Sequence, residues 1–129
     1  MSLTLIRKFY AQVAAGEFAG ALDMFAEDAE VVFTGPASIP LSGSYCGRRE
    51  IERFFGIVGN AFEVEIFQPL EFIDDGTQVA VIGREKSVVR ATGKTFDVNW
   101  VQVWTVEAGR ITRLRDYFDT GTMALAFNY

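Results

Sequence analysis

The chain has 129 residues, half of them hydrophobic, and a formal net charge of -5 at pH 7. This length suits one domain, and the acidic balance argues against a nucleic-acid surface, which depends on clustered cations. The chain contains no histidine, which excludes Ser-His and Cys-His nucleophiles and histidine-containing zinc sites. Any proton transfer must therefore use a carboxylate, a tyrosine, a lysine or water.

The single cysteine, Cys46, excludes an intramolecular disulfide and favours a reducing compartment. The amino-terminal residues have neither a continuous apolar run nor a small-residue cleavage pattern, so we expect no signal peptide and no membrane span. We expect one cytoplasmic domain over residues 1–129, with no metal and no cofactor.

Apolar residues at helical spacing predict three helices in the first half of the chain. The first covers Leu3–Ala15, and a short second helix covers Phe18–Phe25. The third covers Arg48–Val58, where apolar side chains recur at i, i+3, i+4 and i+7. A brief strand, Glu30–Thr34, precedes a loop at Pro36–Gly47 that is rich in Pro, Ser and Gly.

Four β runs follow and predict an antiparallel meander, because glycine-containing turns separate them. The runs are Phe62–Ile73, Gln78–Arg90, Lys94–Val106 and Arg110–Asp119. Pro69 cannot donate a ladder hydrogen bond, so the first of the four is expected at a sheet edge or with a bulge. Long, twisted strands that follow helices predict an α+β fold in which the sheet curls around those helices.

Two-residue loops at Thr92-Gly93 and Ala108-Gly109 predict which side chains share the concave face of this sheet. That face has a polar patch beside apolar residues: Arg84, Lys86, Asn99, Val101, Leu114, Asp116 and Phe118. Arg84 and Asp116 would stand two strands apart, about 10 Å between backbones. A charged pair there is costly to bury without water or a ligand, so these two residues are the main functional candidates.

The opposite face mixes aromatic residues with arginine, a composition typical of a protein–protein interface. We expect a homodimer through this face, whose residues are Trp100, Gln102, Trp104, Arg113 and Arg115.

Four segments together resemble the nuclear-transport-factor-2-like proteins, and more narrowly their SnoaL-like, ketosteroid-isomerase-related branch. The segments are Phe9–Phe18, Leu22–Ala29, Gly43–Arg48 and Gly109–Asp119. The resemblance covers almost the whole chain. It implies a cone in which a strongly curved mixed sheet surrounds helices, with a pocket at the open end and common dimer formation.

The resemblance does not predict steroid isomerisation. Ketosteroid isomerases use an aspartate base on the first strand, a tyrosine of the first helix and a second acid. Phe33, Phe9 and Val101 stand at those positions here, and Phe55 replaces a supporting tyrosine.

Two other branches of the family have functional residues that this chain matches in part. In the limonene-epoxide-hydrolase relatives, Arg84 and Asp116 would match an arginine and a last-strand aspartate, but Lys86 replaces the middle acid. SnoaL-type polyketide cyclases use one aspartate as the base for an aldol closure, and Asp116 is the candidate for that role.

Two hypotheses therefore stay open. In the first, a cofactor-free cyclase, isomerase or lyase acts beside a carbonyl of a polyketide- or terpenoid-like substrate. Asp116 takes the proton, and Arg84, helped by Asn99, stabilises the oxyanion. In the second, the protein is a non-catalytic module that binds a small apolar molecule or only dimerises, and Asp116 neutralises Arg84. Residues expected to line the pocket are Asn99, Lys86, Val101, Leu114, Phe118, Phe9, Phe55 and Tyr10.

Overall fold

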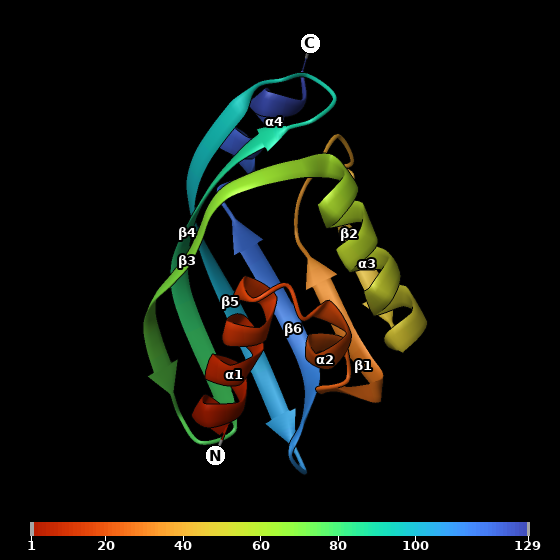
Figure 1. Ribbon diagram of the computed structural model, residues 1–129, viewed down its shortest axis with the longest axis vertical. Coiled ribbons are helices and arrows are strands. Elements are labelled where there is room, and N and C mark those ends of the chain that lie inside the picture. Colours follow the sequence, from red (N-terminus) through yellow and green to blue (C-terminus); the bar gives the residue numbers. More distant parts are fainter. Residues whose placement is uncertain (1, 129) are drawn as a thin grey trace.

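The computed structural model describes residues 2–128, which form four helices and one six-stranded sheet (Figure 1). The helices are α1 (Ser2–Ala14), α2 (Phe18–Leu22), α3 (Arg48–Ala61) and α4 (Thr120–Phe127). The strands are β1 (Phe25–Phe33), β2 (Gly43–Cys46), β3 (Phe62–Asp74), β4 (Gln78–Val89), β5 (Thr95–Glu107) and β6 (Arg110–Phe118). Their order is β2-β1-β6-β5-β4-β3, and only the β1–β6 pair of these described strands is parallel.

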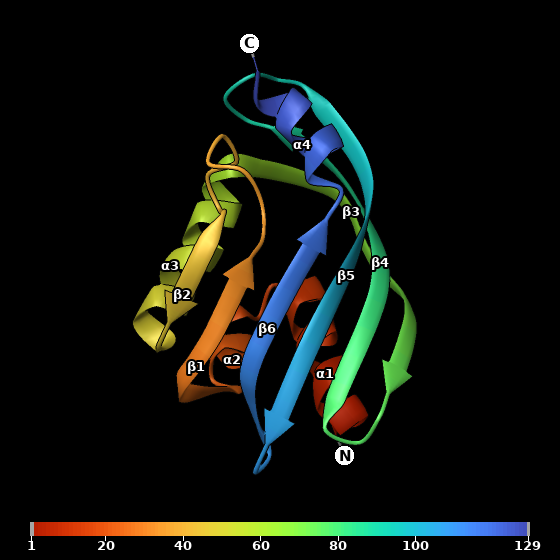
Figure 2. The same cartoon turned by 180° about the vertical axis from the view of Figure 1, so that it is seen from behind.

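Helices α1, α2 and α3 lie on one face of the curved sheet (Figure 1), and in Figure 2 the strands stand in front of α1 and α2. Helix α4 lies at the end of the molecule where β4 turns into β5 (Figure 2). The expected α+β fold, a curved mixed sheet wrapped around N-terminal helices, is confirmed. The edge position of the strand that contains Pro69 is also confirmed, and its pairing with β4 is irregular between Pro69 and Glu71.

Four elements differ from the sequence prediction. Helix α2 ends at Leu22, and β1 begins at Phe25, five residues before the expected strand, because Phe25 already pairs with Ile111 of β6. Strand β2 lies inside the expected loop and pairs antiparallel with β1. Helix α4 follows the last strand, and the Asp119 side chain caps it by accepting a hydrogen bond from the Thr122 amide.

The β4–β5 register is shifted from the predicted one by two residues. Four residues, 90–93, form the loop, so Arg84 stands opposite Asn99 rather than Val101. A shift of two residues keeps every side chain on its expected face. This prediction of register is wrong, but the grouping of β4 and β5 side chains is unchanged.

A β-bulge changes the β5–β6 pairing more deeply. The predicted two-residue loop is present, because Glu107 pairs with Arg110 and Val106 with Ile111. Thr112 then has no partner on β5. Each later residue of β6 therefore pairs with a β5 residue one position away from its predicted partner. Asp116 therefore pairs with Gln102, not with Val101 as predicted.

Burial identifies the face that lies against the helices. Trp100, Gln102 and Trp104 of β5 are 1%, 7% and 0% exposed, and Asp116 and Leu114 of β6 are each 2% exposed. These side chains share the interior with Ile6, Phe9 and Tyr10 of α1.

The predicted concave face is consequently wrong for β4 and β5. Arg84, Lys86, Asn99 and Val101 lie on the outer face, because their strands bury the alternate residues. Three of the residues expected in a dimer interface (Trp100, Gln102 and Trp104) are interior for the same reason. Arg113 and Arg115 remain on the outer face.

Within residues 2–128, none of the helices has the length and apolar character needed to cross a lipid bilayer.

Candidate functional site

A chain of hydrogen-bonded side chains crosses the interior from α1 to β6. Trp104 Nε1 donates to the Tyr10 hydroxyl at 2.9 Å, and that hydroxyl donates to Gln102 Oε1 at 2.5 Å. Gln102 Nε2 then donates to Asp116 Oδ1 at 2.7 Å. The bulge at Thr112 makes this chain possible, because it places Asp116 directly across the ladder from Gln102.

Asp116 is a buried carboxyl group without a cationic partner. No ion pair among residues 2–128 involves it. Burial raises its pKa to about 7, against the opposing effect of the Gln102 hydrogen bond, and the negative charge of Glu85 raises it further. A carboxyl group with such a pKa exchanges protons near neutral pH and can serve as an acid or a base.

Glu85 is a second buried carboxyl group of the same interior. It lies on β4, is 5% exposed, and its Oε2 accepts a hydrogen bond from the Ser87 hydroxyl at 2.7 Å. Burial raises its pKa to about 7, although the Ser87 hydrogen bond opposes this effect. Two acids that titrate near neutrality therefore face one apolar interior.

Tyr10 stays a neutral hydroxyl in this environment. Burial raises its pKa well above the usual value, the hydrogen bond from Trp104 opposes this, and the charge of Asp116 adds to it. Because Tyr10 accepts from Trp104 and donates to Gln102, it fixes the orientation of the Gln102 amide. That amide in turn presents an N–H group to Asp116.

The Trp100 ring lies within the aromatic interior. It stacks on Phe67, with ring centroids 4.9 Å apart, and more loosely on Tyr10 and Phe118. A Cβ atom on Gly83, its neighbour on β4, would stand 2.1 Å from the ring, so any larger residue at this position forces the ring to move. Trp100 Nε1 is buried and has no hydrogen-bond partner, which makes it a free donor inside the cone.

The structure separates the predicted site residues into two groups. Asp116, Tyr10, Phe9 and Leu114 are buried inside, and Phe55 and Phe118 are half-buried against the same core.

The second group lies outside. Arg84 forms a bidentate pair with Asp97 on the outer face, at 3.0 and 2.8 Å. Lys86 Nζ lies 3.8 Å from Glu65, and Asn99 is exposed. The predicted Arg84–Asp116 pair is therefore wrong, and Arg84 cannot stabilise an oxyanion beside Asp116.

Sequence reasoning missed Gln102, Glu85 and Trp100 as site residues. One signal was available, since Glu85 shares one face of β4 with Val81, Gly83, Ser87 and Val89. A lone acid in a row of small or apolar residues indicates a charged group that faces a core.

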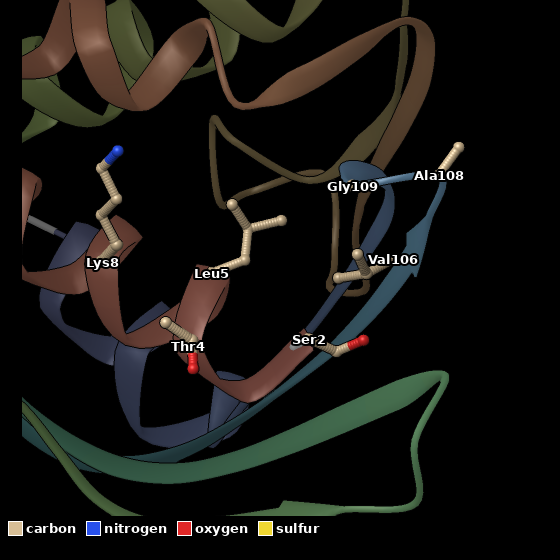
Figure 3. A pocket seen from close by; sticks show the side chains of 7 residues that line it. All are labelled: Ser2, Thr4, Leu5, Lys8, Val106, Ala108 and Gly109. Carbon is tan, nitrogen blue, oxygen red and sulfur yellow. The ribbon is translucent and has the colours of Figure 1, made fainter.

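Two surface pockets of the described residues lie away from this polar chain. The first, of about 380 Å³, lies between α1 and the β5–β6 hairpin (Figure 3). It is lined by Ser2, Thr4, Leu5, Lys8, Val106, Ala108 and Gly109. The second, of about 500 Å³, lies beside α4 and is lined by Lys94, Thr95, Thr122, Leu125 and Ala126. Neither includes Asp116, Glu85 or Trp100.

Comparison with known proteins agrees with the fold. A family model described as a SnoaL-like domain matches residues 6–114. An uncharacterized protein of Mycobacterium tuberculosis (strain ATCC 25618 / H37Rv) is 28% identical over 116 residues, which cover 90% of this chain and 87% of that protein.

Two solved structures are similar over nearly their whole length. An NTF2-like protein of Burkholderia xenovorans LB400 is 30% identical with a TM-score of 0.88, covering 98% of this chain and 95% of that one. TerC, co-crystallised with polyporic acid, is 27% identical with a TM-score of 0.85, covering 97% of this chain and 96% of that one.

Proposed function

Since the chain belongs to the SnoaL-like domain family, we propose that it binds a small apolar carbonyl compound inside the cone and that Asp116 acts on it as a cofactor-free acid–base catalyst. One observation carries this proposal: Asp116 is buried, has no cationic partner and is held by the neutral Gln102 amide. Its pKa of about 7 supports the same role.

The reaction class follows from the chemistry of one base beside one carbonyl. Asp116 removes a proton from the carbon next to the carbonyl, the C–H electron pair forms the enolate double bond, and the carbonyl π pair moves to oxygen. Asp116 then returns the proton to another carbon, which completes an isomerisation. Alternatively, the enolate carbon attacks a second carbonyl of the same molecule and closes a ring; the π pair of that carbonyl moves to its oxygen, which then takes the proton from Asp116.

The enolate oxygen needs a hydrogen-bond donor, and Arg84 does not supply it. We assign that role to the Trp100 Nε1–H group, which is buried and unpaired. A fixed donor in an apolar interior stabilises a developing negative charge more than the same donor in water.

The aromatic lining favours a substrate that is itself largely apolar, such as a polyketide- or terpenoid-like molecule. Phe55 and Trp104 both pack against Phe9 beside the polar chain. TerC supports the same view, because that 27% identical relative was crystallised with a small organic molecule.

A non-catalytic role is the second candidate, and the filled interior favours it. Both described pockets are at the surface. The polar chain through Tyr10, Gln102 and Asp116 would then only hold the core together, in a module that binds a small apolar ligand or dimerises.

We also propose that the protein self-associates through the outer face of the sheet. The residues involved differ from those expected from the sequence, because Trp100, Gln102 and Trp104 lie inside. Ile82, Val101 and Val103 are half-buried there beside Arg115, whose Nε is shielded and has no hydrogen-bond partner. A second copy would cover these side chains and supply an acceptor. Sedimentation equilibrium is expected to give the mass of two chains, and a monomer at all concentrations would contradict this.

Proton exchange tests the catalytic proposal. 1-Tetralone in heavy water has one enolisable carbon, and its exchange for deuterium is followed by proton NMR. We expect the wild-type protein to accelerate this exchange and Asp116→Asn to lose about 100-fold or more of the acceleration. The control Glu71→Gln changes an exposed acid on β3 and is expected to exchange like the wild type.

Two outcomes contradict the catalytic proposal. In one, Asp116→Asn keeps the full exchange rate although circular dichroism shows a native fold. In the other, the wild-type protein binds 1-tetralone and leaves its exchange at the solvent rate, which supports the non-catalytic role.

A further inference from the structure

Glu85 is a buried acid that the proposed proton transfer does not use. Strand alternation separates it from the cations beside it in the chain. Arg84 and Lys86 point outward and pair with Asp97 and Glu65, while Glu85 points inward and is 5% exposed.

The surroundings of Glu85 on the inner face are apolar. Its neighbours across the ladders are Phe67 on β3 and Val98 on β5. Ser87 donates to Oε2, and no ion pair of the described residues includes Glu85. A carboxyl group buried in this way destabilises a fold unless its remaining oxygen also finds a partner.

Glu85 and Asp116 mark the two ends of one strip of the inner face. Gln102 and Asp116 share one row across the sheet, Trp100 and Phe118 share the next, and Glu85 stands in the row after that. Two rows correspond to about 13 Å along the strands, because each row takes two residues. The two acids also stand two strands apart, since β5 lies between β4 and β6, and the charge of Glu85 is felt at Asp116.

The Trp100 ring fills the row between the two acids, with its unpaired Nε1–H group inside the cone. Phe67 and Phe118, which stack on this ring, are only half-buried. Movement of either side chain opens the strip to a flat molecule that lies edge-on to the Trp100 Nε1–H group. The carbonyl end of such a molecule meets this donor and Asp116, and its other end meets Glu85.

We infer that Glu85 is a second ligand-binding residue of the cone and that it selects a flat, elongated ketone with a hydroxyl group at the end opposite to the reacting carbonyl. This inference rests on the proposed function, since it places the carbonyl at Trp100 and Asp116. The ligand hydroxyl donates its hydrogen to the Glu85 oxygen that Ser87 leaves free. The substrate class is therefore a hydroxylated aromatic or fused-ring ketone rather than a hydrocarbon-like one.

Binding of matched ketones to the wild-type protein tests this inference. The probes are 6-hydroxy-1-tetralone, 6-methoxy-1-tetralone and 1-tetralone, compared by isothermal titration calorimetry. We expect the hydroxy compound to bind about tenfold more tightly than 1-tetralone, because a hydrogen bond to a charged group adds to the same ring contacts. The methoxy compound has no hydrogen to donate and is expected to show no such gain.

Two substitutions assign the preference to Glu85. Glu85→Leu removes a buried acid and fills the site with an apolar side chain, so the fold is expected to persist. In this variant, 6-hydroxy-1-tetralone and 1-tetralone should bind with equal affinity. The affinity for 1-tetralone should differ from that of the wild type by less than about threefold. Glu85→Gln keeps an acceptor without the charge and should retain part of the preference. Glu71→Gln serves as the surface control.

The outcomes separate this inference from the proposed function. Equal binding of the hydroxy compound and 1-tetralone to the wild type, or a full preference in Glu85→Leu, overturns the role of Glu85 and leaves Asp116 untouched. If neither 6-hydroxy-1-tetralone nor 1-tetralone binds to the wild type, the proposed function fails, and the inference fails with it. A tenfold preference that disappears in Glu85→Leu supports the inference.

Discussion

Asp116 is held inside the protein by an amide group and not by a cation. Its Oδ1 accepts from Gln102, and the outer-face Arg84 is fully engaged by Asp97. Burial therefore favours the protonated form of Asp116 with no cation to offset it, which raises its pKa to about 7 although the Gln102 hydrogen bond opposes this effect.

This raised pKa has a consequence for stability. The folded state holds the proton of Asp116 more tightly than the unfolded chain does, where the ordinary pKa is 3.8. The stabilisation is complete below that ordinary pKa and disappears as the pH rises through about 7. At alkaline pH the loss is roughly 4 kcal/mol, taking about 1.4 kcal/mol for each pH unit between the two values.

We expect wild-type stability to fall relative to Asp116→Asn between about pH 4 and pH 8. Urea unfolding at several pH values measures this difference. Glu71→Gln should run parallel to the wild type, because it changes an exposed acid. If the wild type and Asp116→Asn have parallel stability curves, Asp116 is not a buried acid with a raised pKa.

At the residue scale, the sequence allowed only part of the site to be predicted. Asp116 and Tyr10 lie inside as expected. Arg84 and Asn99 were assigned to the wrong side because period-two alternation shows which residues share a face but not which face is buried. Here the mixed face with Trp100, Gln102 and Glu85 is the buried one.

At the scale of elements, the bulge in β6 determines the chemistry of the interior. Thr112 is the extra residue, and its hydroxyl donates to the Thr105 carbonyl oxygen. Beyond it, Leu114 pairs with Trp104 and Asp116 with Gln102. No residue type marks a bulge of this kind, so this part of the register was not predictable from the sequence.

The register predicts how two deletions in β6 should differ. Deletion of Thr112 leaves a regular ladder with the same pairs beyond it, so the protein should fold with a loss of roughly 1–3 kcal/mol. Deletion of Arg115 turns Asp116 to the outer face, and we expect no cooperative unfolding. Thermal unfolding compares the two variants. If the Arg115 deletion folds and the Thr112 deletion does not, the bulge is not what sets the inner face.

Glycine positions offer a matched pair of tests in two other elements. In Gly83→Ala the new Cβ would stand 2.1 Å from the Trp100 ring, which must move. We expect a loss of about 1–3 kcal/mol and a change in tryptophan fluorescence. Gly56, in α3, has no heavy atom within 4 Å of such a Cβ, so Gly56→Ala should stabilise the protein by about 0.5–1 kcal/mol. Equal effects of the two substitutions would contradict the close contact of Gly83 and Trp100.

The elements themselves were predictable to different degrees. Helices α1 and α3 and the β3–β6 meander follow from clear periodicity. Strand β2 has only four residues, too few to show alternation. Helix α4 has eight residues, mostly small or apolar, without a polar face that would indicate a helix.

At the scale of the whole molecule, the resemblance to a known family predicted the cone more securely than the strand register predicted its contents. The cone depends on the order of helices and strands, which tolerates a shift of one residue. The site does not, because one extra residue in β6 changes which side chains meet. This is why the fold was confirmed while the predicted strand partner of Asp116 was wrong.

The central claim, that the cone holds a carbonyl compound between Trp100 and Asp116, is tested most directly by NMR of the tryptophan side chains. The chain has two tryptophans, so a nitrogen-15 spectrum contains two indole N–H signals. On titration with 1-tetralone we expect the Trp100 signal to shift strongly, because its N–H group is free, and the Trp104 signal less, because it already donates to Tyr10. If neither signal moves at saturation while the amides of Leu5 and Gly109 do, the ligand binds the surface pocket and the claim is contradicted.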